Sequence, residues 1–477
     1  MRWKSFSNMV VWVFVATALM LGGVASVAGD KPATSTNALT VLYNFGGRDG
    51  DPLYPQYQGI IAQGRDGNMY STTPYGGTSN YGAVFKITPT GTMTVLHSFA
   101  GNDVAVDSGL TLGSDGNFYG TTIYGGSNYG TLFVITPDGV MNIVYDFTGQ
   151  NDDAYPSAPP IQSDRGQFYG TATGDFYGNG GEVYKMTASG NKVRLFHFTR
   201  HYGAAPADPL VQASDGNFYG TTSSGGTSGN CGQYGCGVVF RLTPAGRYTV
   251  LHNFQGGVDG FYPVAALIEG NDGAFYGSVP QGGPHEWGVV FKITRAGKFG
   301  LLHSFTGGLD GRYPTTALVE ATDGNLYGTA EQGGTAKSGV VFKITPKGKF
   351  SVVYNFDGAT SAYPEVTLLQ HTNGKLFGDT FGGGPYEYGT FFSLDLGLGP
   401  FVSLVSSAGK VEESIGILGQ GFSGTTGVSF NGKSAKFRIK SDTFLMATVP
   451  KGATSGLVTV TTPSGPLKSN KKFRVIS

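Results

Sequence analysis

The chain has 477 residues, of which 79 are glycine and only 13% are charged. Such a length indicates more than one domain, and a surface poor in Lys and Glu is more typical of turn-rich all-β proteins than of helical ones. Because 32 basic residues balance 32 acidic ones, there is no global positive field to hold a polyanion, which excludes nucleic acid as an expected partner.

The first 28 residues have the pattern of a cleaved secretory signal. Arg2 and Lys4 precede an almost unbroken apolar run over residues 9–21, and small residues end the segment at Ala28. An uncleaved anchor is the alternative, but about 13 apolar residues are short of the roughly 20 that span a bilayer. We therefore expect a secreted or cell-surface protein, with the periplasm as the alternative location, and a linker over residues 29–38.

A turn-and-strand unit recurs seven times along the chain. Its copies begin at Asp66, Asp115, Arg165, Asp215, Asp272, Asp323 and Asn373, at spacings of 49, 50, 50, 57, 51 and 50 residues. About four short strands fit each interval, which is typical of a β-propeller. In one copy we expect strands over residues 316–320, 325–330, 339–345 and 350–356, with Asp323-Gly324 as a tight turn.

The two ends of the repeat region are complementary. The chain enters at residues 39–45 with a fourth strand that lacks the first three, and it leaves at residues 389–394 with a third strand that lacks a fourth. Pairing these segments would close a ring and remove an exposed sheet edge. The sequence therefore predicts an all-β fold in which residues 39–397 form a seven-bladed β-propeller closed by an N-terminal strand.

Two motifs characterise the repeat: Asp-Gly-Asn-Phe-Tyr-Gly-Thr-Thr at residues 215–222 and Gly-Val-Val-Phe-Arg-Leu-Thr-Pro at residues 237–244. With these motifs the repeat resembles the GloVer-type tandem repeat of exported bacterial proteins, and the resemblance covers about residues 39–397. It implies export and extracellular or surface placement. It carries no catalytic residues that can be transferred to this chain.

The repeat period stops at Gly397. The segments that follow resemble the strands of an IPT/TIG domain: residues 417–422, 427–433, 444–450, 455–463 and 473–476. The resemblance implies an immunoglobulin-like β-sandwich over residues 398–477, and Asn431-Gly432 is a ready hairpin turn. Related domains include DNA-binding ones, a role that export argues against here.

Charge is divided unevenly between the two parts. Residues 398–477 hold ten Lys+Arg and three Asp+Glu, whereas the linker and the repeats hold 20 and 29. We interpret this as weak mutual attraction of two solvated surfaces. The alternative is that the basic residues Lys468, Lys471, Lys472 and Arg474 rest on an anionic envelope or polysaccharide.

Cys231 and Cys236 are the only cysteines of the chain. An oxidising compartment would let them form a local disulfide, whereas a metal site would require more Cys or His residues nearby. We therefore expect a disulfide, and neither a metal ion nor a cofactor.

The connections between the second and third strands hold the candidate binding residues. Each pairs a polar residue with an aromatic one before a glycine: Asn80-Tyr81, Asn128-Tyr129, Glu286-Trp287 and Glu387-Tyr388. These loops lie on the usual binding face of a propeller, where aromatic rings stack on sugar C–H faces and polar groups bind hydroxyls. Packing of each aromatic residue on the next blade's loop is the simpler alternative, and the sequence leaves it open.

Other recurring residues favour structural roles. Histidines alternate with Tyr and Phe at one strand position, which is typical of core packing: these are His97, His252 and His303. His197 and His201 have a metal-ligand spacing only by chance, because they lie in a strand and a loop. The Tyr-Pro pairs at Tyr54, Tyr155, Tyr262, Tyr313 and Tyr363 suit packing before a strand. Asp-Gly pairs at Asp49, Asp259 and Asp310 suit turns rather than Ca²⁺ sites.

A non-catalytic binding or adhesion protein, which recognises a glycan or a surface protein, fits these observations best. A polysaccharide lyase or glycoside hydrolase and a purely structural surface protein are the alternatives, since the fold does not choose among them. An enzyme would use the cluster Glu286, His285, Glu365 and Glu387. Seven near-equivalent blades, none of them strongly polar, favour binding.

Overall fold

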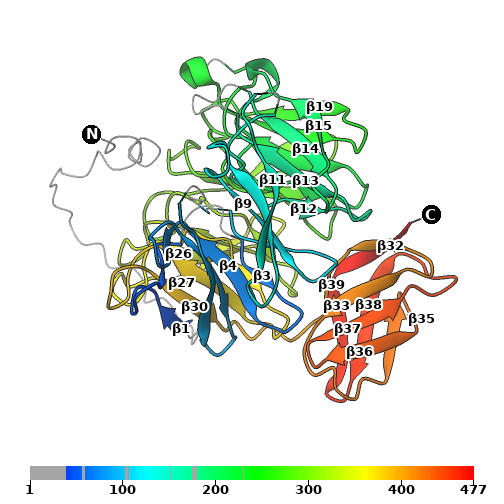
Figure 1. Ribbon diagram of the computed structural model, residues 1–477. Helices are drawn as coiled ribbons and strands as arrows, with labels where there is room; N and C mark the ends of the chain where they lie inside the picture. Colours follow the sequence, from blue (N-terminus) through cyan, green and yellow to red (C-terminus); the bar gives the residue numbers. More distant parts are fainter. Residues whose placement is uncertain are drawn as a thin grey trace. The chain divides into compact units, whose positions relative to one another are not determined.

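The computed structural model describes residues 39–476 apart from residues 56–59, 102–105, 107, 151, 175–179 and 229. The predicted signal, residues 1–28, and the predicted linker, residues 29–38, lie outside this part. The described part is all-β, as predicted, with two short 3-10 helices, η1 Arg200–Tyr202 and η2 Gly232–Tyr234 (Figure 1). Within it, neither helix has the length and apolar character needed to cross a membrane.

Repeat 6 shows the recurring pattern clearly. Four antiparallel strands follow one another in the sheet: β24 Val319–Glu320, β25 Leu326–Ala330, β26 Val340–Ile344 and β27 Phe350–Asn355. We call these positions strands a, b, c and d. Strand b is buried throughout, strand c is buried except at one residue, and strand d is only partly covered. Strand a is shorter than the predicted 316–320, because only its last two residues pair with strand b.

The other six sheets of the repeat region have the same order. They are β3 Ala62–Gln63, β4 Met69–Thr73, β6 Ala83–Ile87 and β7 Met93–Ser98 in repeat 1; β8 Thr111–Leu112, β9 Phe118–Thr122, β10 Thr131–Ile135 and β11 Met141–Asp146 in repeat 2; β12 Ile161–Gln162, β13 Phe168–Ala172, β14 Glu182–Met186 and β15 Lys192–His197 in repeat 3; β16 Val211–Gln212, β17 Phe218–Thr222, β18 Val238–Leu242 and β19 Tyr248–Asn253 in repeat 4; β20 Ile268–Glu269, β21 Phe275–Val279, β22 Val289–Ile293 and β23 Phe299–Ser304 in repeat 5; and β28 Leu369–Gln370, β29 Leu376–Thr380, β30 Thr390–Leu394 and β1 Leu39–Asn44 in repeat 7. Two further short strands, β2 Pro52–Leu53 and β5 Tyr75–Gly76, pair with each other. The described part of residues 39–394 thus holds seven four-stranded antiparallel sheets, consistent with propeller-like blades.

The last sheet is completed by the first strand of the chain. Leu39 pairs with Leu394 and Asn44 with Thr390 in the antiparallel ladder of β1 and β30, so the pairing predicted for these segments is observed. Phe45, directly after β1, is fully buried in a cluster with residues of repeats 1 and 7. The N-terminal strand therefore links the two ends of the repeat region.

Hydrogen bonds at the end of strand a join successive sheets. The backbone N–H of Ser114 in repeat 2 donates to Oε1 of Gln162 in repeat 3 at 2.7 Å. Corresponding bonds run from Asp164 to Gln212, from Ser214 to Glu269, from Asn271 to Glu320, from Thr322 to Gln370 and from Thr372 to Gln63. The last of these bonds joins repeat 7 to repeat 1, and the N–H of Leu110 donates to the carbonyl of Ile60 between repeats 1 and 2. The sheets therefore form a closed series.

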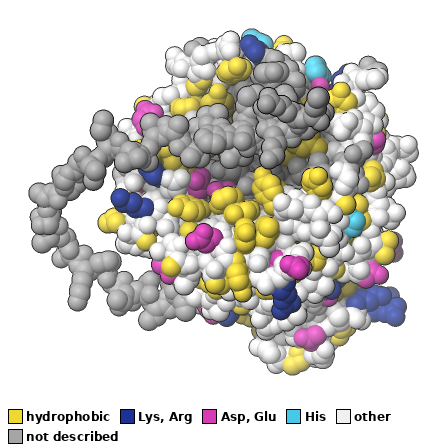
Figure 2. Space-filling view, turned by 60° about the vertical axis from the view of Figure 1, so that its left-hand side comes forward, with side chains coloured by type: hydrophobic (Ala, Val, Ile, Leu, Met, Phe, Trp, Pro, Cys, Tyr) yellow, Lys and Arg dark blue, Asp and Glu magenta, His cyan; other side chains and the backbone are white. Residues whose placement is uncertain are grey.

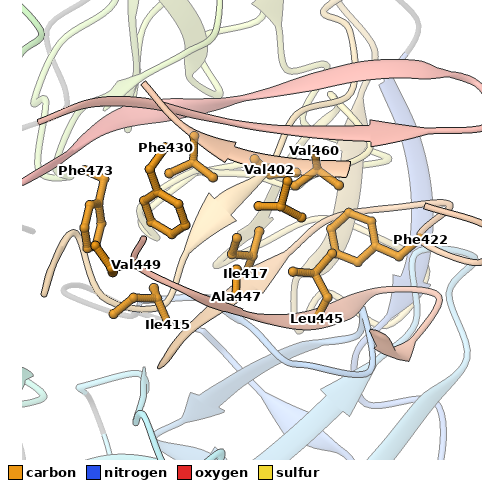
Figure 3. Close-up of a cluster of buried hydrophobic side chains, with 12 residues drawn as sticks. Val402, Ile415, Ile417, Phe422, Phe430, Leu445, Ala447, Val449, Val460 and Phe473 are labelled. Atoms are coloured by element: carbon orange, nitrogen blue, oxygen red, sulfur yellow. The ribbon is translucent and has the colours of Figure 1, made fainter. Parts of the chain in front are cut away.

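Two further sheets follow the repeats. One contains β31 Ser403–Leu404, β33 Ser414–Leu418, β37 Phe444–Thr448 and β36 Phe437–Ser441; the other contains β32 Ala408–Lys410, β39 Gly465–Ile476, β38 Gly456–Thr462, β34 Gly427–Phe430 and β35 Lys433–Ser434. Both contribute to one apolar core, which includes Ile417, Leu445, Val460 and Phe473 (Figure 3). The predicted Asn431-Gly432 turn joins β34 to β35, and both of its residues have positive φ angles, as a tight hairpin requires.

The C-terminal sheets contact the a–b turns of the repeats. The hydroxyl of Thr443 donates to the carbonyl of Arg65 at 2.7 Å, and the Arg65 guanidinium lies 4.6 Å from the centre of the Phe444 ring. Lys471 pairs with Glu320 at 2.9 Å, and Arg474 pairs with Asp164. These ion pairs agree with the interpretation that the two oppositely charged parts attract each other. The a–b turns lie at the end of the sheets opposite the b–c and d–a loops, since successive strands are antiparallel.

Candidate ligand-binding face

In the described part of the chain, hydrogen bonds join b–c loops to d–a loops at one end of the sheets. In repeat 5 the backbone N–H of Tyr313 donates to the carbonyl oxygen of Trp287 at 3.1 Å. The same bond joins Tyr54 to Tyr388, Tyr155 to Tyr129, Tyr262 to Cys236 and Tyr363 to Ser338. Isolated β-bridges also join several d–a loops to the b–c loop of the next repeat, for example between Arg312 and Gln332. The predicted common face of these loops is therefore observed.

The tyrosines of the Tyr-Pro pairs have a strained backbone. Their φ angles are positive, at 52° for Tyr54, 63° for Tyr155, 58° for Tyr262, 57° for Tyr313 and 58° for Tyr363. A left-handed conformation costs a bulky residue on the order of 1–3 kcal/mol and persists only where its surroundings enforce it. The hydrogen bond from each of these N–H groups to a b–c carbonyl is such a constraint. Strain of this kind clusters at ligand-binding sites, and here it recurs in five loops of one face.

Backbone conformation also explains the polar residue beside each b–c aromatic residue. Asn80, Asn128, Glu286 and Glu387 all have positive φ angles, between 59° and 74°. Lys337 has the same conformation in repeat 6, where Ser338 replaces the aromatic residue. Repeat 6 thus keeps a polar residue at this position although no aromatic residue follows it. We conclude that the left-handed backbone conformation of the loop favours a polar residue there, and that the polar residue alone does not indicate a sugar-binding site. Asn80 in fact accepts the N–H of Gly76 within its own loop at 3.0 Å.

The four predicted aromatic residues differ in exposure. Tyr81 and Tyr129 are 47% and 37% exposed, whereas Trp287 and Tyr388 are half-buried and pack against the apolar clusters of the sheets. The Trp287 ring lies 5.4 Å from that of Tyr313, and the Arg312 guanidinium lies 4.8 Å above it. The packing alternative therefore describes Trp287 and Tyr388 better than the other two.

Exposed tyrosines concentrate on this face. Among the described residues six tyrosines are 37–48% exposed, and all six lie in b–c or d–a loops: Tyr81, Tyr129, Tyr202, Tyr234, Tyr363 and Tyr386. Sequence comparison of the repeats missed Tyr202, Tyr234 and Tyr386, because they do not occupy equivalent positions; only their location between strands b and c or between d and a could have revealed them. Only 13% of the residues in the chain are charged, and the view in Figure 2 shows charged side chains scattered among uncharged ones.

The acidic candidates for catalysis are distributed over different loops. His285 and Glu286 lie in the b–c loop of repeat 5, where Nδ1 of His285 is 3.2 Å from the Ser304 hydroxyl. Glu387 lies in the b–c loop of repeat 7, and Glu365 is buried before strand a of that repeat. Repeat 6 separates the first two residues from the others. No group of three or more His, Cys, Asp or Glu side chains suited to a metal occurs in the part of the chain that the structure describes.

The strand d histidines are partly buried and pack against core aromatic residues, so the predicted packing role is observed although they are not fully buried. His303 stacks on Phe350 at 3.8 Å between ring centres, and its Nε2 lies 3.1 Å from Oδ2 of Asp310. Burial lowers the pKa of His303, and Asp310 partly opposes that shift. Equivalent pairs join Tyr43 to Asp51, Tyr145 to Asp152 and His252 to Asp259. The aspartates of these turns thus form hydrogen bonds with side chains of strand d. In the first copy Asp51, rather than Asp49, makes this contact.

Repeat 3 contains a buried ion pair where repeats 5 and 6 have apolar residues, which is a local departure from the expected near-equivalence of the blades. The fully buried Glu182 pairs with Lys192, which is only 5% exposed and lies 5.2–5.4 Å from the rings of Tyr145, Phe147 and Tyr184. Burial raises the pKa of Glu182, against the effect of Lys192.

The two histidines with a metal-ligand spacing also lie in this repeat. Nδ1 of His197, at the end of β15, lies 2.9 Å from Asp153, while His201 lies in η1. The side chain of His197 therefore contacts Asp153 rather than a second histidine.

Two buried aspartates escaped sequence analysis. Asp379 occupies a position in strand b where the other repeats have Thr or Ser, and the hydroxyl of Thr121 there donates to the next repeat's Ala158 carbonyl. Neither carboxylate oxygen of Asp379 has a hydrogen-bond partner in the described structure, and burial raises its pKa well above the ordinary value. Asp208 accepts a 2.8 Å hydrogen bond from Thr221, and burial raises its pKa to about 7.

Asp379→Thr should make the protein more stable at pH 7. Because the pKa of Asp379 is raised in the folded state, the folded protein retains a proton that the unfolded chain releases above about pH 4. Native stability therefore falls as the pH rises from about 4 towards the folded pKa, and the substitution removes this loss, which we expect to be about 1–3 kcal/mol. Urea denaturation at pH 4 and pH 7 measures it: the advantage of the variant should be larger at pH 7, and an equal difference at both pH values would contradict the assignment.

Cys231 and Cys236 are joined by a disulfide bond. It closes the b–c loop of repeat 4 around η2, and Cys236 is fully buried in an apolar cluster with Phe254 and Tyr219. The cysteines therefore shape the candidate face in the one repeat whose interval is lengthened to 57 residues.

Comparison with known proteins identifies the repeat. No curated protein matches the chain. A fungal alcohol oxidase in complex with copper is 14% identical and has a TM-score of 0.51, with 89% of this chain and 98% of that chain covered. A gluconolactonase from Xanthomonas campestris is 13% identical with a TM-score of 0.39, covering 73% and 98% of the two chains. At this identity the first likeness shows a shared fold only.

The model of one family, the Gloeobacter/Verrucomicrobia repeat, matches residues 54–233 and 229–437. Together the two matches cover more than half of the chain, and the chain therefore belongs to the Gloeobacter/Verrucomicrobia repeat family.

Proposed function

We propose that this is an exported, non-catalytic glycan-binding protein of the cell surface. In this proposal the seven sheets are the blades of a closed β-propeller over residues 39–397, and residues 398–477 form an immunoglobulin-like domain of the IPT/TIG type. The closed series of inter-sheet hydrogen bonds and the shared core of the two C-terminal sheets support that division. The signal pattern of residues 1–28 supports export.

The concentration of exposed tyrosines on the b–c and d–a face carries the proposal. A tyrosine left in water exposes a large apolar ring without gaining burial, so six of them on one face indicate a surface that a ligand covers. Rings with a hydroxyl suit a ligand that is apolar on one side and polar at its edge, and sugars have that character. The recurring strain at the Tyr-Pro pairs of the same face supports a ligand-binding role.

Replacing Tyr81 and Tyr129 by alanine should weaken glycan binding while the fold survives. Both rings are well exposed, and each lost stacking contact should cost on the order of 1 kcal/mol, so the two together lower the affinity about 25-fold. A glycan array of the mature protein identifies the ligand, and titration calorimetry with that glycan compares the variants.

Ile143→Ala with Val193→Ala is the matched control, because these side chains are equally exposed but lie on strand d of repeats 2 and 3. The control should bind like the native protein. Unchanged binding by the tyrosine variant would reject the face, and a mature protein that binds nothing on the array would reject glycan recognition. Trp287→Ala with Tyr388→Ala should instead lower the melting temperature, because these two rings are half-buried.

A further inference from the structure

A groove lies between the C-terminal sheets and the a–b turns of repeats 5 and 6. Its volume is about 590 Å³, and its walls include Asn271 and Thr322 from the repeats and Leu457, Lys468, Asn470 and Lys472 from the C-terminal sheets. A space of this size is typical of small-molecule and oligosaccharide sites. It lies among the a–b turns, at the opposite end of the sheets from the b–c and d–a loops that carry the six exposed tyrosines, which we call the tyrosine-rich face.

The charges around this groove are unbalanced. Of the four basic residues of the C-terminal strand, Lys471 and Arg474 form ion pairs with carboxylates of the repeats. Lys468 and Lys472 are exposed, line the groove, and form no ion pair with any residue that the structure describes. No Asp or Glu is among the residues described as lining it. Neither ammonium group therefore has a direct ion-pair partner among the described residues, although the exposed carboxylate of Asp323 lies between the lining residues Thr322 and Gly324.

The strand pairing sets these lysines side by side. Lys472 lies opposite Leu457 and Lys468 opposite Thr459 in the β38–β39 ladder, with a bulge in β39 between them. Because Leu457 and Thr459 are two residues apart on β38, the backbones of the two lysines are about 7 Å apart. Leu457 and Thr459 alternate with buried residues, so they and the lysines opposite share the outward face of the sheet.

The remaining walls supply apolar and amide groups. Leu457 is 37% exposed, and Pro466 and Pro400 also line the groove. The side-chain amide of Asn271 donates to the carbonyl of Asn470 at 3.4 Å, so amide groups of both parts meet there. Sugars use this combination: C–H faces on apolar side chains, hydroxyls on amides and acid groups on ammonium groups.

We propose that this groove binds an acidic sugar chain, with carboxylate or sulfate groups at Lys468 and Lys472. Nucleic acid is disfavoured because the whole chain carries no net positive charge. An acidic peptide would satisfy the lysines but would make little use of the apolar wall. The proposal does not depend on the tyrosine-rich face, which lies at the other end of the repeats.

The test uses the mature full-length protein and an oligogalacturonide of defined length, with its fully methyl-esterified form as the neutral probe. Lys468→Gln with Lys472→Gln should lower the affinity for the acidic oligosaccharide about tenfold, which corresponds to about 1.4 kcal/mol. The ester should bind much more weakly than the acid, and added salt should weaken the binding of the acid.

Lys436→Gln with Lys440→Gln is the matched control, because it removes the same charge from two exposed positions, one directly before β36 and one within it, in the other C-terminal sheet. The control should change the affinity less than twofold, and so should the Tyr81 and Tyr129 variant, which separates this site from the proposed glycan face. Equal losses in the groove and control variants would show non-specific charge attraction and overturn the proposal. Equal binding of acid and ester, no binding of either, or tighter binding of poly-glutamate than of the oligosaccharide would overturn it as well.

Discussion

A chain that begins at residue 46 should melt at a much lower temperature than one that begins at Leu39. The longer chain retains β1, which supplies strand d of repeat 7 and pairs with β30 except at an irregularity between Val41 and Tyr43. The shorter chain loses that ladder and also Phe45, which is fully buried between repeats 1 and 7. Removing the Phe45 side chain alone should cost about 3–5 kcal/mol.

The full deletion should exceed that cost, because it also exposes the backbone of β30 as a new sheet edge. Typical domains are stable by only 5–15 kcal/mol, so a large part of the stability depends on this strand. Calorimetry of the two chains gives the comparison, with a chain that begins at residue 29 as the reference. Equal melting temperatures for chains that begin at 39 and 46 would show that closure by β1 is dispensable.

Lys192→Met should destabilise the protein by about 3–5 kcal/mol, because it leaves the buried Glu182 carboxylate with only the partly exposed Arg194, at 4.0 Å, as a cationic neighbour. The repeats themselves suggest the compensating change. Repeats 5 and 6 have Val at the position of Glu182 and Phe at the position of Lys192. The double variant Glu182→Val with Lys192→Phe should therefore restore most of the lost stability or exceed the native value, since apolar replacements of buried ion pairs are often neutral or stabilising.

Chemical denaturation of the single and double variants measures both effects. The control is Lys292→Met, which breaks the partly exposed pair with Asp272 at 2.7 Å and should cost no more than about 1 kcal/mol. A loss in Lys192→Met no larger than in this control would show that the pair in repeat 3 is effectively solvated. A double variant less stable than Lys192→Met would contradict the proposed compensation, because the apolar pair would then fit repeat 3 less well than the unpaired glutamate does.

Local patterns were sufficient to predict the strands and their closure. The Asp323-Gly324 turn, the Asn431-Gly432 turn and the pairing of residues 39–45 with residues 389–394 each depend on neighbouring residues or on the phase of the repeat. Strand a is the exception. Only the last two of its five predicted residues pair with strand b, because the chain before them runs towards the neighbouring sheet, and the sequence does not show where that pairing begins.

Contacts between sheets could not be predicted from one sequence. Glu182 and Lys192 are ten residues apart on neighbouring strands, and neither differs from a surface residue until burial is known. The docking of Lys471 on Glu320 joins residues that no repeat relates. In the candidate face, Tyr81 is exposed whereas Trp287 packs against a buried cluster, although both residues have the same local motif.

The pairing of Leu39 with Leu394 also determines when the molecule can be completed during synthesis. Strand β1 is translated before every other strand that the structure describes, but its partner β30 is translated only after the first six repeats. Contacts so distant in sequence form slowly, and an unpaired strand exposed in the meantime can pair with another chain. Newly made chains should therefore depend on chaperones that prevent β1 from pairing with other chains until β30 is available.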